Sequence, residues 1–285
     1  NWYGYMGLST DSYALTVGSG GDFTGCRAHM GYLLFFKADM IHKLYGTEPS
    51  NYQLSDTPCR GVRKGSEKSA VIVNEVLYYQ SGRDICAYGS ALPTAVSEKL
   101  GGTAYSGAVA GALGGRYYVS MRDGASQWSL FCYDTQTGVW MREDDTHALA
   151  FAALDGDLYY IDAADNSLYS VNGQMPTGAV REGTIAWYAE TGDLGLDIPD
   201  QKYISGIQIA ATVEAGATLR VALMYDEDGT WHEITRVAML TKRMFTLPIC
   251  TQRCGMLRVR LSGEGVSYVY SMTLTIEQGS DQNGV

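Results

Sequence analysis

The sequence predicts an all-β chain made of a β-propeller followed by an antiparallel β-sandwich. Its 285 residues include 21 Tyr against 6 Phe, and 34 Gly against 6 Pro. This balance favours short strands and tight turns, because aromatic side chains fit a half-buried pleated face and glycine accepts turn conformations. A unit of blade length recurs in the first part, and a sandwich-like alternation of apolar and polar residues fills the second. The length leaves room for two cores.

A predicted hairpin recurs four times in the first part of the chain. Phe35, Tyr78, Tyr117 and Tyr159 mark equivalent positions, separated by 43, 39 and 42 residues. This spacing is typical of a four-stranded propeller blade, which takes roughly 40 to 50 residues. The hairpin segments are YLLFFKADMIHKLYG from Tyr32, EVLYYQSGRDICAYG from Glu75, GRYYVSMRDGASQWSLFCYD from Gly115 and GDLYYIDAADNSLYSVNG from Gly156.

Small or β-branched residues before three of the hairpins predict the inner strand of each blade. Blades converge at the central axis, where bulky side chains would clash. Four glycines in SGAVAGALGG disfavour a helix there, since each costs about 1 kcal/mol in a helix interior. The predicted inner strands are SAVIV from Ser69, SGAVAGAL from Ser106 and ALAFAAL from Ala148. The predicted outer strands are NYQLSD from Asn51, TAVSEKL from Thr94 and GVWMRED from Gly138.

The repeats predict at least four blades, in a propeller that need not be complete. No clear outer strand follows Gly173, while NWYGYMGLST and DSYALTV near the start belong to no complete blade. We therefore hypothesise that the N-terminal segment closes the ring. Further residues upstream would add blades.

A second domain follows a linker. The period stops at Gln174, and GQMPTGAVREG has the Gly, Pro and polar composition of a connecting segment. The predicted domains are a propeller over 1–176 and a jelly-roll or immunoglobulin-like sandwich over 184–278. Seven or eight strands are expected, and the tail QGSDQNGV is expected to fray. The strand segments are TIAWYAE, KYISGIQIAATV, ATLRVALMY, TWHEITRVAM, RMFTLPI, GMLRVRLSG and SYVYSMTLTIE.

Charge and hydropathy patterning exclude two classes of partner. The formal charge of −10 argues against specific nucleic-acid binding, because gripping phosphates needs clustered Lys and Arg. Apolar patches such as GYLLFF from Gly31 have strand length, well short of the roughly 18 residues of a spanning helix, so no membrane insertion is expected. The chain starts at Asn1 with no signal-peptide pattern, so a signal is either absent or already removed.

Six scattered cysteines predict neither a zinc site nor a disulfide framework. No CxxC pair or Cys/His cluster has metal-site spacing. Cys86 and Cys132 lie in apolar strand patterns, where a free thiol behaves as a small hydrophobe. Buried thiols are therefore expected, and this mildly favours a reducing compartment.

Two similar stretches, YDTQTGVW from Tyr133 and YDEDGTW from Tyr225, are interpreted as turns. In the first, Asp134 can accept backbone N–H groups, Gly138 can take a positive φ and Trp140 can pack along the return strand. Asp226, Gly229 and Trp231 are expected to do the same. Calcium binding by Asp226 and Asp228 is the alternative, but the further acidic ligands of a calcium loop are missing.

No catalytic, cofactor-binding or metal-binding residue is predicted. REDDTHAL gathers Glu143, Asp144, Asp145 and His147, which is more typical of a solvated loop between blades than of an acid/base set. GSGGD from Gly18 precedes no helix that could bind phosphate and is interpreted as a flexible turn. The other histidines, His29, His42 and His232, have no matching carboxylate motif, and no nucleophile motif is present.

Aromatic residues leave a glycan-directed function open. Trp140, Trp187 and Trp231, with the many tyrosines, could provide a sugar-stacking platform on the propeller's axial face or on the sandwich. A sialidase-like site would need an arginine cluster and repeated S-x-D-x-G-x-x-W turns, and YDTQTGVW matches only the end of that pattern. Strand aromatics are more often part of the core.

Several phrases resemble phage and prophage virion proteins, in particular the propeller-bearing tail hub or nozzle proteins of short-tailed phages. They are YLLFFKADMIHKLYG, NEVLYYQSGRDICAYG, SLFCYDTQTGVW, WYAETGDLGLDIPDQKYISGIQI, MYDEDGTWHEI and LPICTQRCGMLRVRLSGEG. The resemblance covers most of the chain. It implies a location in the virion, and in the bacterial host cytoplasm during assembly, with other virion proteins as partners and a homo-oligomeric ring formed by the full-length protein.

The leading expectation is therefore a non-enzymatic structural component of a phage or prophage particle that acts as a protein–protein assembly platform, without cofactors. The alternative is a carbohydrate-binding or glycan-active propeller and sandwich protein. The two expectations differ in one testable property, since only the alternative requires a surface that binds sugars.

Overall fold

A computed structural model describes residues 17–47, 51–171, 173, 184–195, 202–249 and 253–278. The chain divides into two compact units, residues 1–179 and 180–285. Each unit has its own hydrophobic core and is described by itself. The predicted domain boundaries stay a prediction, because residues 174–183 lie outside the described ones.

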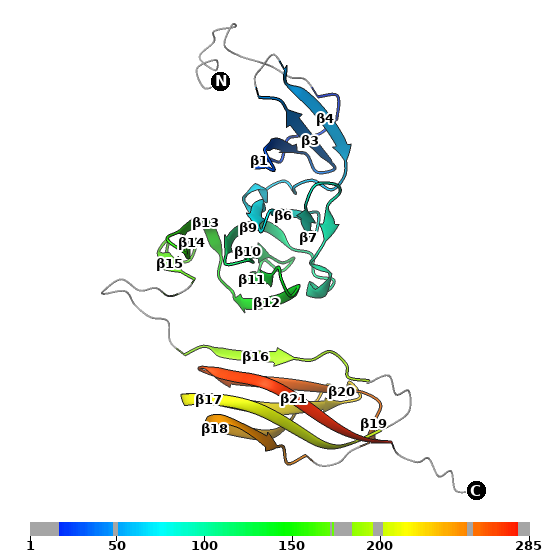
Figure 1. The fold of residues 1–285 in the computed structure, drawn as a ribbon, viewed down its shortest axis with the longest axis vertical. Coiled ribbons are helices and arrows are strands. Elements are labelled where there is room, and N and C mark those ends of the chain that lie inside the picture. Colours follow the sequence, from blue (N-terminus) through cyan, green and yellow to red (C-terminus); the bar gives the residue numbers. More distant parts are fainter. Residues whose placement is uncertain are drawn as a thin grey trace, which may run out of the picture. The chain divides into compact units, whose positions relative to one another are not determined.

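Unit 1 is a β-propeller whose described residues form four successive blades, each an antiparallel meander (Figure 1). The first blade contains β1 (Gly25–His29), β2 (Tyr32–Phe36), β3 (Met40–Tyr45) and β4 (Gln53–Pro58). The second contains β5 (Val71–Val73), β6 (Val76–Ser81), β7 (Asp84–Tyr88) and β8 (Thr94–Ala95). The third contains β9 (Ser106–Leu113), β10 (Arg116–Arg122), β11 (Trp128–Asp134) and β12 (Val139–Asp144). The fourth contains β13 (Ala148–Leu154), β14 (Asp157–Asp162) and β15 (Leu168–Ser170).

The blades follow the predicted pattern closely, with three differences. The first blade has an inner strand, β1, that the sequence pattern did not reveal, because its residues GCRAH are neither small throughout nor β-branched. The predicted outer strand TAVSEKL is only two residues long and continues into the short 3₁₀ helix η4 (Glu98–Leu100). A second 3₁₀ helix, η3 (Glu67–Ser69), precedes β5 and includes the first residue of the predicted strand SAVIV.

The same tight turn joins the first two strands of every blade. Both residues of each turn have a positive φ, which is the type I′ geometry that matches the twist of a hairpin. Three of the four turns have a non-glycine residue at one or both of these positions, where a positive φ is energetically unfavourable. The turns are Met30–Gly31, Asn74–Glu75, Gly114–Gly115 and Asp155–Gly156.

The four aromatic positions taken as equivalent in the sequence do not share one face. Tyr78 and Tyr159 are the third residues of β6 and β14, whereas Phe35 is the fourth of β2 and Tyr117 the second of β10. Successive side chains of a strand point to opposite faces, so the expectation of equivalence is wrong. Tyr78 and Tyr117 instead meet between blades two and three, with ring centroids 5.4 Å apart.

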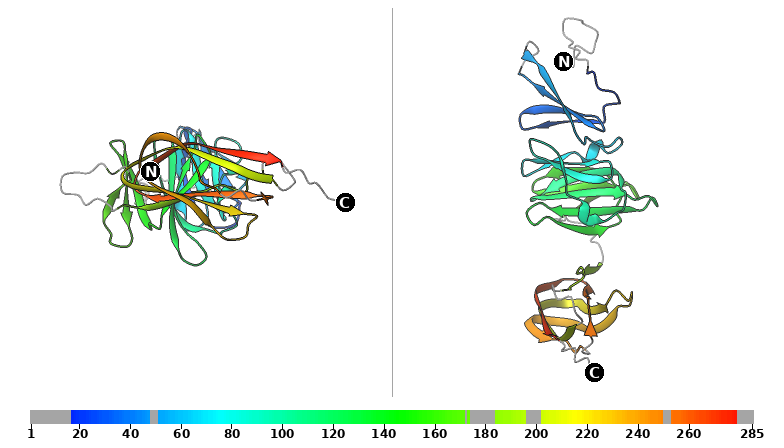
Figure 2. Two further views of the ribbon diagram at one scale, coloured as in Figure 1. Left: turned by 90° about the horizontal axis from the view of Figure 1, so that it is seen from below. Right: turned by 90° about the vertical axis from the view of Figure 1, so that its right-hand side faces the viewer.

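Figure 2 shows the strands of unit 1 from two further sides. Hydrophobic clusters join each blade to the next. Leu34 and Phe36 of blade one pack with Leu77 and Tyr79 of blade two. The second and third blades share the cluster that contains Tyr78 and Tyr117, and the third and fourth share one that contains Tyr118 and Leu158. In the described residues no such cluster joins blade four to blade one. The proposed closing segment at the N-terminus lies outside the described part of the chain.

The small-residue strands lie where blades approach one another, as the sequence predicts. SGAVAGAL forms strand β9 rather than a helix, and it packs against β5 and β13. Gly111 shows how close the approach is, since a Cβ placed there would lie 2.7 Å from the Cβ of Phe151 and 2.8 Å from a methyl carbon of Leu158. Only glycine fits this position without displacing the next blade.

Buried polar side chains supply hydrogen bonds to the inner strands. Ser66 Oγ donates to Gln80 Oε1 over 2.7 Å, and the backbone N–H of Ala108 lies 3.2 and 3.3 Å from these two oxygens. In the next blade Ser120 Oγ accepts the backbone N–H of Ala148 over 3.1 Å. In both cases a side-chain oxygen therefore accepts a backbone N–H near the start of the inner strand, β9 or β13, which would otherwise be buried without a partner.

Unit 2 is an antiparallel β-sandwich whose two layers are formed largely by one folded hairpin. Its strands follow the order β16-β20-β17-β18, and β19 and β21 also pair with β17 (Figure 1). The predicted pairs of segments 202–213 with 217–225, and 230–239 with 243–249, merge into two long strands. The strands are β16 (Ala186–Glu190), β17 (Lys202–Tyr225), β18 (His232–Thr246), β19 (Arg253–Cys254), β20 (Leu257–Glu264) and β21 (Ser267–Gln278).

The long strand β17 passes from one layer to the other. Residues 202–213 pair with β21, residues 218–225 pair with β20, and β18 follows both halves. The register shifts between Val213 and Thr218, where Gly216 has a φ of 84°. The two halves enclose a core that includes Ile207, Leu219 and Val259. The fold-back therefore explains why one strand contributes to both sides of the core.

The described cysteines are free thiols. Cys86, Cys132 and Cys254 are buried, Cys59 is partly buried and Cys26 is exposed, so the expectation of buried thiols is wrong for Cys26. Burial raises the pKa of Cys132 to about 11. In the part of the chain that the structure describes, no helix is long and apolar enough to cross a membrane.

We predict that Gly111→Ala lowers the free energy of unfolding of unit 1 by about 1–3 kcal/mol, because the added methyl group overpacks the contact with Phe151. Gly102→Ala is the control, since a Cβ there meets nothing within 4 Å and its φ is not positive. Denaturant titration of the full chain measures both. Equal transition midpoints for the two variants would contradict the close approach of β9 to blade four.

Candidate functional site

The first turn motif has a structural role. Asp134 Oδ1 accepts the backbone N–H groups of Gln136 and Thr137 over 2.9 and 3.1 Å, and these bonds lower the pKa of Asp134. Gly138 has a φ of 66°. Trp140 packs against Tyr133, with ring centroids 4.8 Å apart. These contacts confirm the interpretation of YDTQTGVW as a turn.

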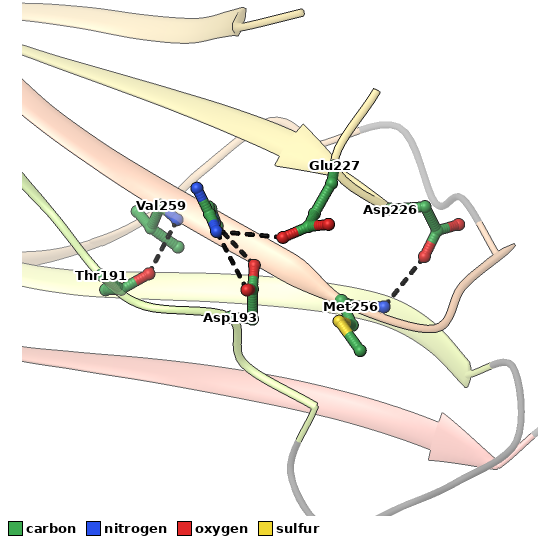
Figure 3. A network of polar contacts seen from close by, with 7 residues as sticks. Thr191, Asp193, Asp226, Glu227, Met256 and Val259 are labelled. Atoms are coloured by element: carbon green, nitrogen blue, oxygen red, sulfur yellow. Dashed lines mark hydrogen bonds and ion pairs between the residues drawn. The ribbon is translucent and has the colours of Figure 1, made fainter. Parts of the chain in front are cut away.

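In the second turn motif Asp228 bonds the turn itself, whereas Asp226 bonds another segment, so the expectation that Asp226 acts as Asp134 does is wrong. Asp226 and Glu227 both have a positive φ, and Asp226 Oδ1 accepts the backbone N–H groups of Gly255 and Met256 over 2.6 and 2.9 Å (Figure 3). Asp228 Oδ1 accepts the N–H of Thr230. Both carboxylates therefore accept hydrogen bonds from backbone N–H groups. The tryptophan of this motif, Trp231, contacts β20, because the guanidinium carbon of Arg260 lies 4.1 Å from its ring centroid. Its packing along the return strand stays a prediction.

The acidic segment REDDTHAL does not assemble into a site. Asp144 Oδ1 accepts the backbone N–H of Thr146 over 2.8 Å, and His147 stacks on Trp128 at a centroid distance of 3.5 Å. Burial lowers the pKa of His147. Among the described residues, no three His, Cys, Asp or Glu side chains lie close enough together to hold a metal ion.

The strongest candidate for a binding site is a groove on the outer face of the sandwich. It is open, has a volume of about 360 Å³ and lies over β16, β20 and the second half of β17. Leu257 and Val259 of β20 point into the core, so the alternate residues Arg258, Arg260 and Ser262 point outward. The side chains that line the groove include Trp187, Tyr188, Glu190, Arg220, Arg260 and Glu264.

An arginine held between aromatic rings and a carboxylate forms the centre of this groove. Arg260 lies directly opposite Glu190 in the strand pairing, and its Nη2 lies 2.6 Å from Glu190 Oε1. Its guanidinium carbon lies 4.1 Å from the ring centroid of Trp231 and 5.8 Å from that of Tyr188. These contacts fix the guanidinium group, since cation–π attraction and the ion pair act on it together.

The aromatic residues of the groove differ in exposure. Tyr188 is 68% exposed, and its ring has no other aromatic neighbour among the described residues. Trp187 is partly buried, packs against the core and donates its indole N–H to the backbone oxygen of Gly265 over 3.0 Å. Trp187 is therefore part of the groove's support, and Tyr188 is the ring available to a ligand.

A second arginine on this face makes no ion pair with any carboxylate that the structure describes. Arg220 of β17 lies directly opposite Arg236 of β18 in the strand pairing. In the described residues neither arginine makes an ion pair. Like charges placed opposite one another on a strand pair repel, so an anionic group bound beside them would lower the energy of the arrangement.

A polar network extends the same face beyond the groove. Arg258 Nε and Nη2 donate to the two carboxylate oxygens of Asp193 over 2.6 and 2.9 Å, and Nη2 also donates to Glu227 over 3.1 Å (Figure 3). This bidentate pair lowers the pKa of Asp193. The segment that follows β16 is thereby attached to β20, next to the groove.

Sequence reasoning identified Trp187 and Trp231 as possible sugar-contacting residues but missed the others. The ion pair of Arg260 joins residues 70 positions apart, and no local motif marks such a pair. A usable signal was the alternation in LRVRLSGE, which places charged residues on the outward face of a strand, where Arg260 lies opposite Glu190 of β16.

Comparison with known proteins gave matches to solved structures only. No protein-family model and no curated protein matches the chain. An exo-β-1,3-galactanase from Phanerochaete chrysosporium with bound galactose is 10% identical, covers 84% of this chain and 78% of its own, and has a TM-score of 0.31. A variant of that enzyme with β-1,3-galactotriose has the same identity and coverage and a TM-score of 0.30. A glycoside hydrolase is 9% identical, covers 86% of this chain and 83% of its own, and has a TM-score of 0.28.

These comparisons contradict two expectations from the sequence. The solved chains named above are glycan-active enzymes, so the expectations of a non-enzymatic virion component and of a protein that is not an enzyme are both corrected. At these TM-scores the likeness assigns neither a substrate nor a catalytic residue to this chain. The resemblance to phage tail proteins stays untested, as do the expected virion location, the virion partners and the ring.

We predict that Arg258→Met raises the pKa of Asp193 toward the ordinary value of about 3.9, because the carboxylate loses the hydrogen bonds that favour its charged form. In the unmodified protein the pair stabilises the fold above that ordinary pKa, and the stabilisation is lost as the pH falls through the lowered pKa. Carboxyl chemical shifts in an NMR titration measure this change. Arg236→Met is the control, and an equal pKa of Asp193 in both variants would contradict the assignment.

Proposed function

We propose that the protein binds glycans through the groove over β16, β20 and β17. The observation that carries the proposal is the exposed ring of Tyr188 beside the fixed pair of Arg260 and Glu190. A sugar presents apolar C–H groups on one face of its ring and hydroxyl groups around its edge. An exposed aromatic ring next to ordered charged groups complements both features.

The polar groups of the groove are suited to hydroxyl recognition. Glu190 can accept a hydroxyl hydrogen, and the N–H groups of Arg260 that do not bond Glu190 can donate to a hydroxyl oxygen. Because Trp231 and Glu190 already fix Arg260, little side-chain entropy is lost when a sugar binds. The volume of about 360 Å³ lies at the small end of ligand sites, which fits one or two sugar units rather than a long chain.

Arg220 favours a sugar that carries an acidic group. It lies in the groove, opposite Arg236, without a carboxylate partner in the described residues. A carboxylate or sulfate bound there would be paired with two guanidinium groups. We therefore expect uronic-acid or sulfated glycans to bind more tightly than neutral glycans of the same size, with a preference that weakens as salt is added.

The test is binding of the full chain to neutral and acidic oligosaccharides, on a glycan array and by calorimetry. An open groove of this size is expected to bind its best ligand with a micromolar dissociation constant. Tyr188→Ala should weaken binding of every glycan at least tenfold, because it removes the stacking surface. Arg220→Met should weaken acidic glycans about tenfold and leave neutral ones nearly unchanged.

The control variant is Tyr268→Ala. Tyr268 is 50% exposed on β21, in the part of the sandwich where β17 pairs with β21 rather than with β20. It should bind glycans as the unmodified protein does. The proposal is wrong if the unmodified chain binds no glycan, or if Tyr188→Ala and Tyr268→Ala have equal effects.

A further inference from the structure

A serine, a histidine and an aspartate of the first blade are connected in the order of a nucleophilic triad. His42 Nδ1 lies 2.6 Å from Asp56 Oδ1, and His42 Nε2 lies 3.0 Å from Ser19 Oγ. His42 lies on β3 and Asp56 lies opposite it on β4, while Ser19 belongs to the segment before β1. The three residues are distant in sequence, and no sequence motif indicates that they lie together.

The hydrogen bonds fix the tautomer that nucleophilic catalysis needs. The Asp56 carboxylate can only accept, so Nδ1 of His42 carries the hydrogen that joins them. In neutral His42 the other ring nitrogen, Nε2, then has a free electron pair and accepts the hydroxyl hydrogen of Ser19. The His42 side chain is fully buried, so its ring cannot turn away from either partner without losing both bonds.

The loop that holds Ser19 is anchored by a buried positive charge. Lys37 is 3% exposed, and its Nζ donates to the backbone oxygens of Ser19 and Gly20 over 2.5 and 3.2 Å. In the described part of the chain the N–H groups of Gly20 and Gly21 make no hydrogen bond, so they can donate to an oxyanion. Donors and positive charge next to a serine stabilise the negative charge that forms when it attacks a carbonyl carbon.

The surface beside the triad suits a small acyl group. Phe23 is 54% exposed, and its ring centroid lies 5.7 Å from that of His42. Ser19 itself is partly exposed between the exposed residues Gly18 and Gly20. A short acyl chain could contact Phe23 while its carbonyl carbon approaches Ser19 Oγ.

We propose that Ser19, His42 and Asp56 hydrolyse short-chain carboxylic esters. Ser19 Oγ bonds to the carbonyl carbon while its proton moves to His42 Nε2, and the alcohol leaves with that proton as the C–O bond breaks. Water then attacks the acyl-serine, gives a proton to His42, and releases the carboxylic acid as the proton returns to Ser19 Oγ. The net reaction consumes one ester and one water and yields one acid and one alcohol, without an oxidant or a metal.

Fluorophosphonate labelling tests the nucleophile directly. The serine oxygen displaces fluoride from phosphorus, so we expect one adduct per chain, which tandem mass spectrometry places on Ser19. Ser19→Ala should remove this adduct. Ser55→Ala is the matched control, because Ser55 is an exposed serine next to Asp56 whose hydroxyl makes no hydrogen bond to the triad in the described structure, and labelling of Ser19 in this variant should be unchanged.

Ester hydrolysis tests the roles of the other residues. With p-nitrophenyl acetate, Ser19→Ala should lower the enzymatic rate at least a hundredfold. Asp56 is a positioning residue, so Asp56→Asn should slow both hydrolysis and labelling at least tenfold, and Asp56→Glu should restore part of the loss. Denaturation midpoints of the variants check that blade one is intact.

The outcomes separate catalysis from a structural role. If the unmodified protein takes no label on Ser19 and hydrolyses the ester no faster than Ser19→Ala does, the three residues only hold the first blade together. The triad lies in unit 1 and the groove in unit 2, so failure of this test leaves glycan binding unaffected, and failure of glycan binding leaves the triad unaffected.

Discussion

The close approach of inner strands is the constraint on which the propeller depends. Gly111 leaves no room for a side chain against Phe151, and the buried amides at the start of β9 and β13 are bonded by Gln80 and Ser120 of the preceding blades. Tight packing and satisfied backbone groups are linked here, because strands that approach this closely exclude the water that would otherwise bond their amides. The aromatic clusters between blades can form only when the inner strands meet in this way.

Much of this architecture could be predicted from local sequence patterns, and the features that were predicted wrongly have physical explanations. Repeated hairpins and small-residue strands are encoded in neighbouring residues, so the blades were predictable. The sheet face on which Phe35 and Tyr117 lie was not predictable, because a shift of one residue relative to the turn moves a side chain to the opposite face of the strand. The bend of β17 was also missed, since its apolar alternation reads as two strands whether or not the chain folds back between them.

The candidate sites were less predictable because they depend on pairing between distant strands. Trp187 and Trp231 stand out in the sequence, yet Arg260, which lies beside the ring of Trp231, is set by the register of β16 against β20. His42 similarly meets Asp56 only because β3 and β4 pair in one register, and Ser19 only through a loop held by Lys37. No spacing rule links such residues, so the topology has to be known before the chemistry can be inferred.

The period of two along β20 couples the groove to the stability of the sandwich. Leu257 and Val259 enter the core, and Arg258 and Arg260 take the alternate positions on the outer face. A slip of one residue would bury two guanidinium groups and expose the core, at a cost larger than the stability of a typical domain. The core therefore fixes the position of Arg260 relative to Glu190 and Trp231. The groove is rigid because its side chains alternate along β20 with core side chains whose positions are fixed by packing.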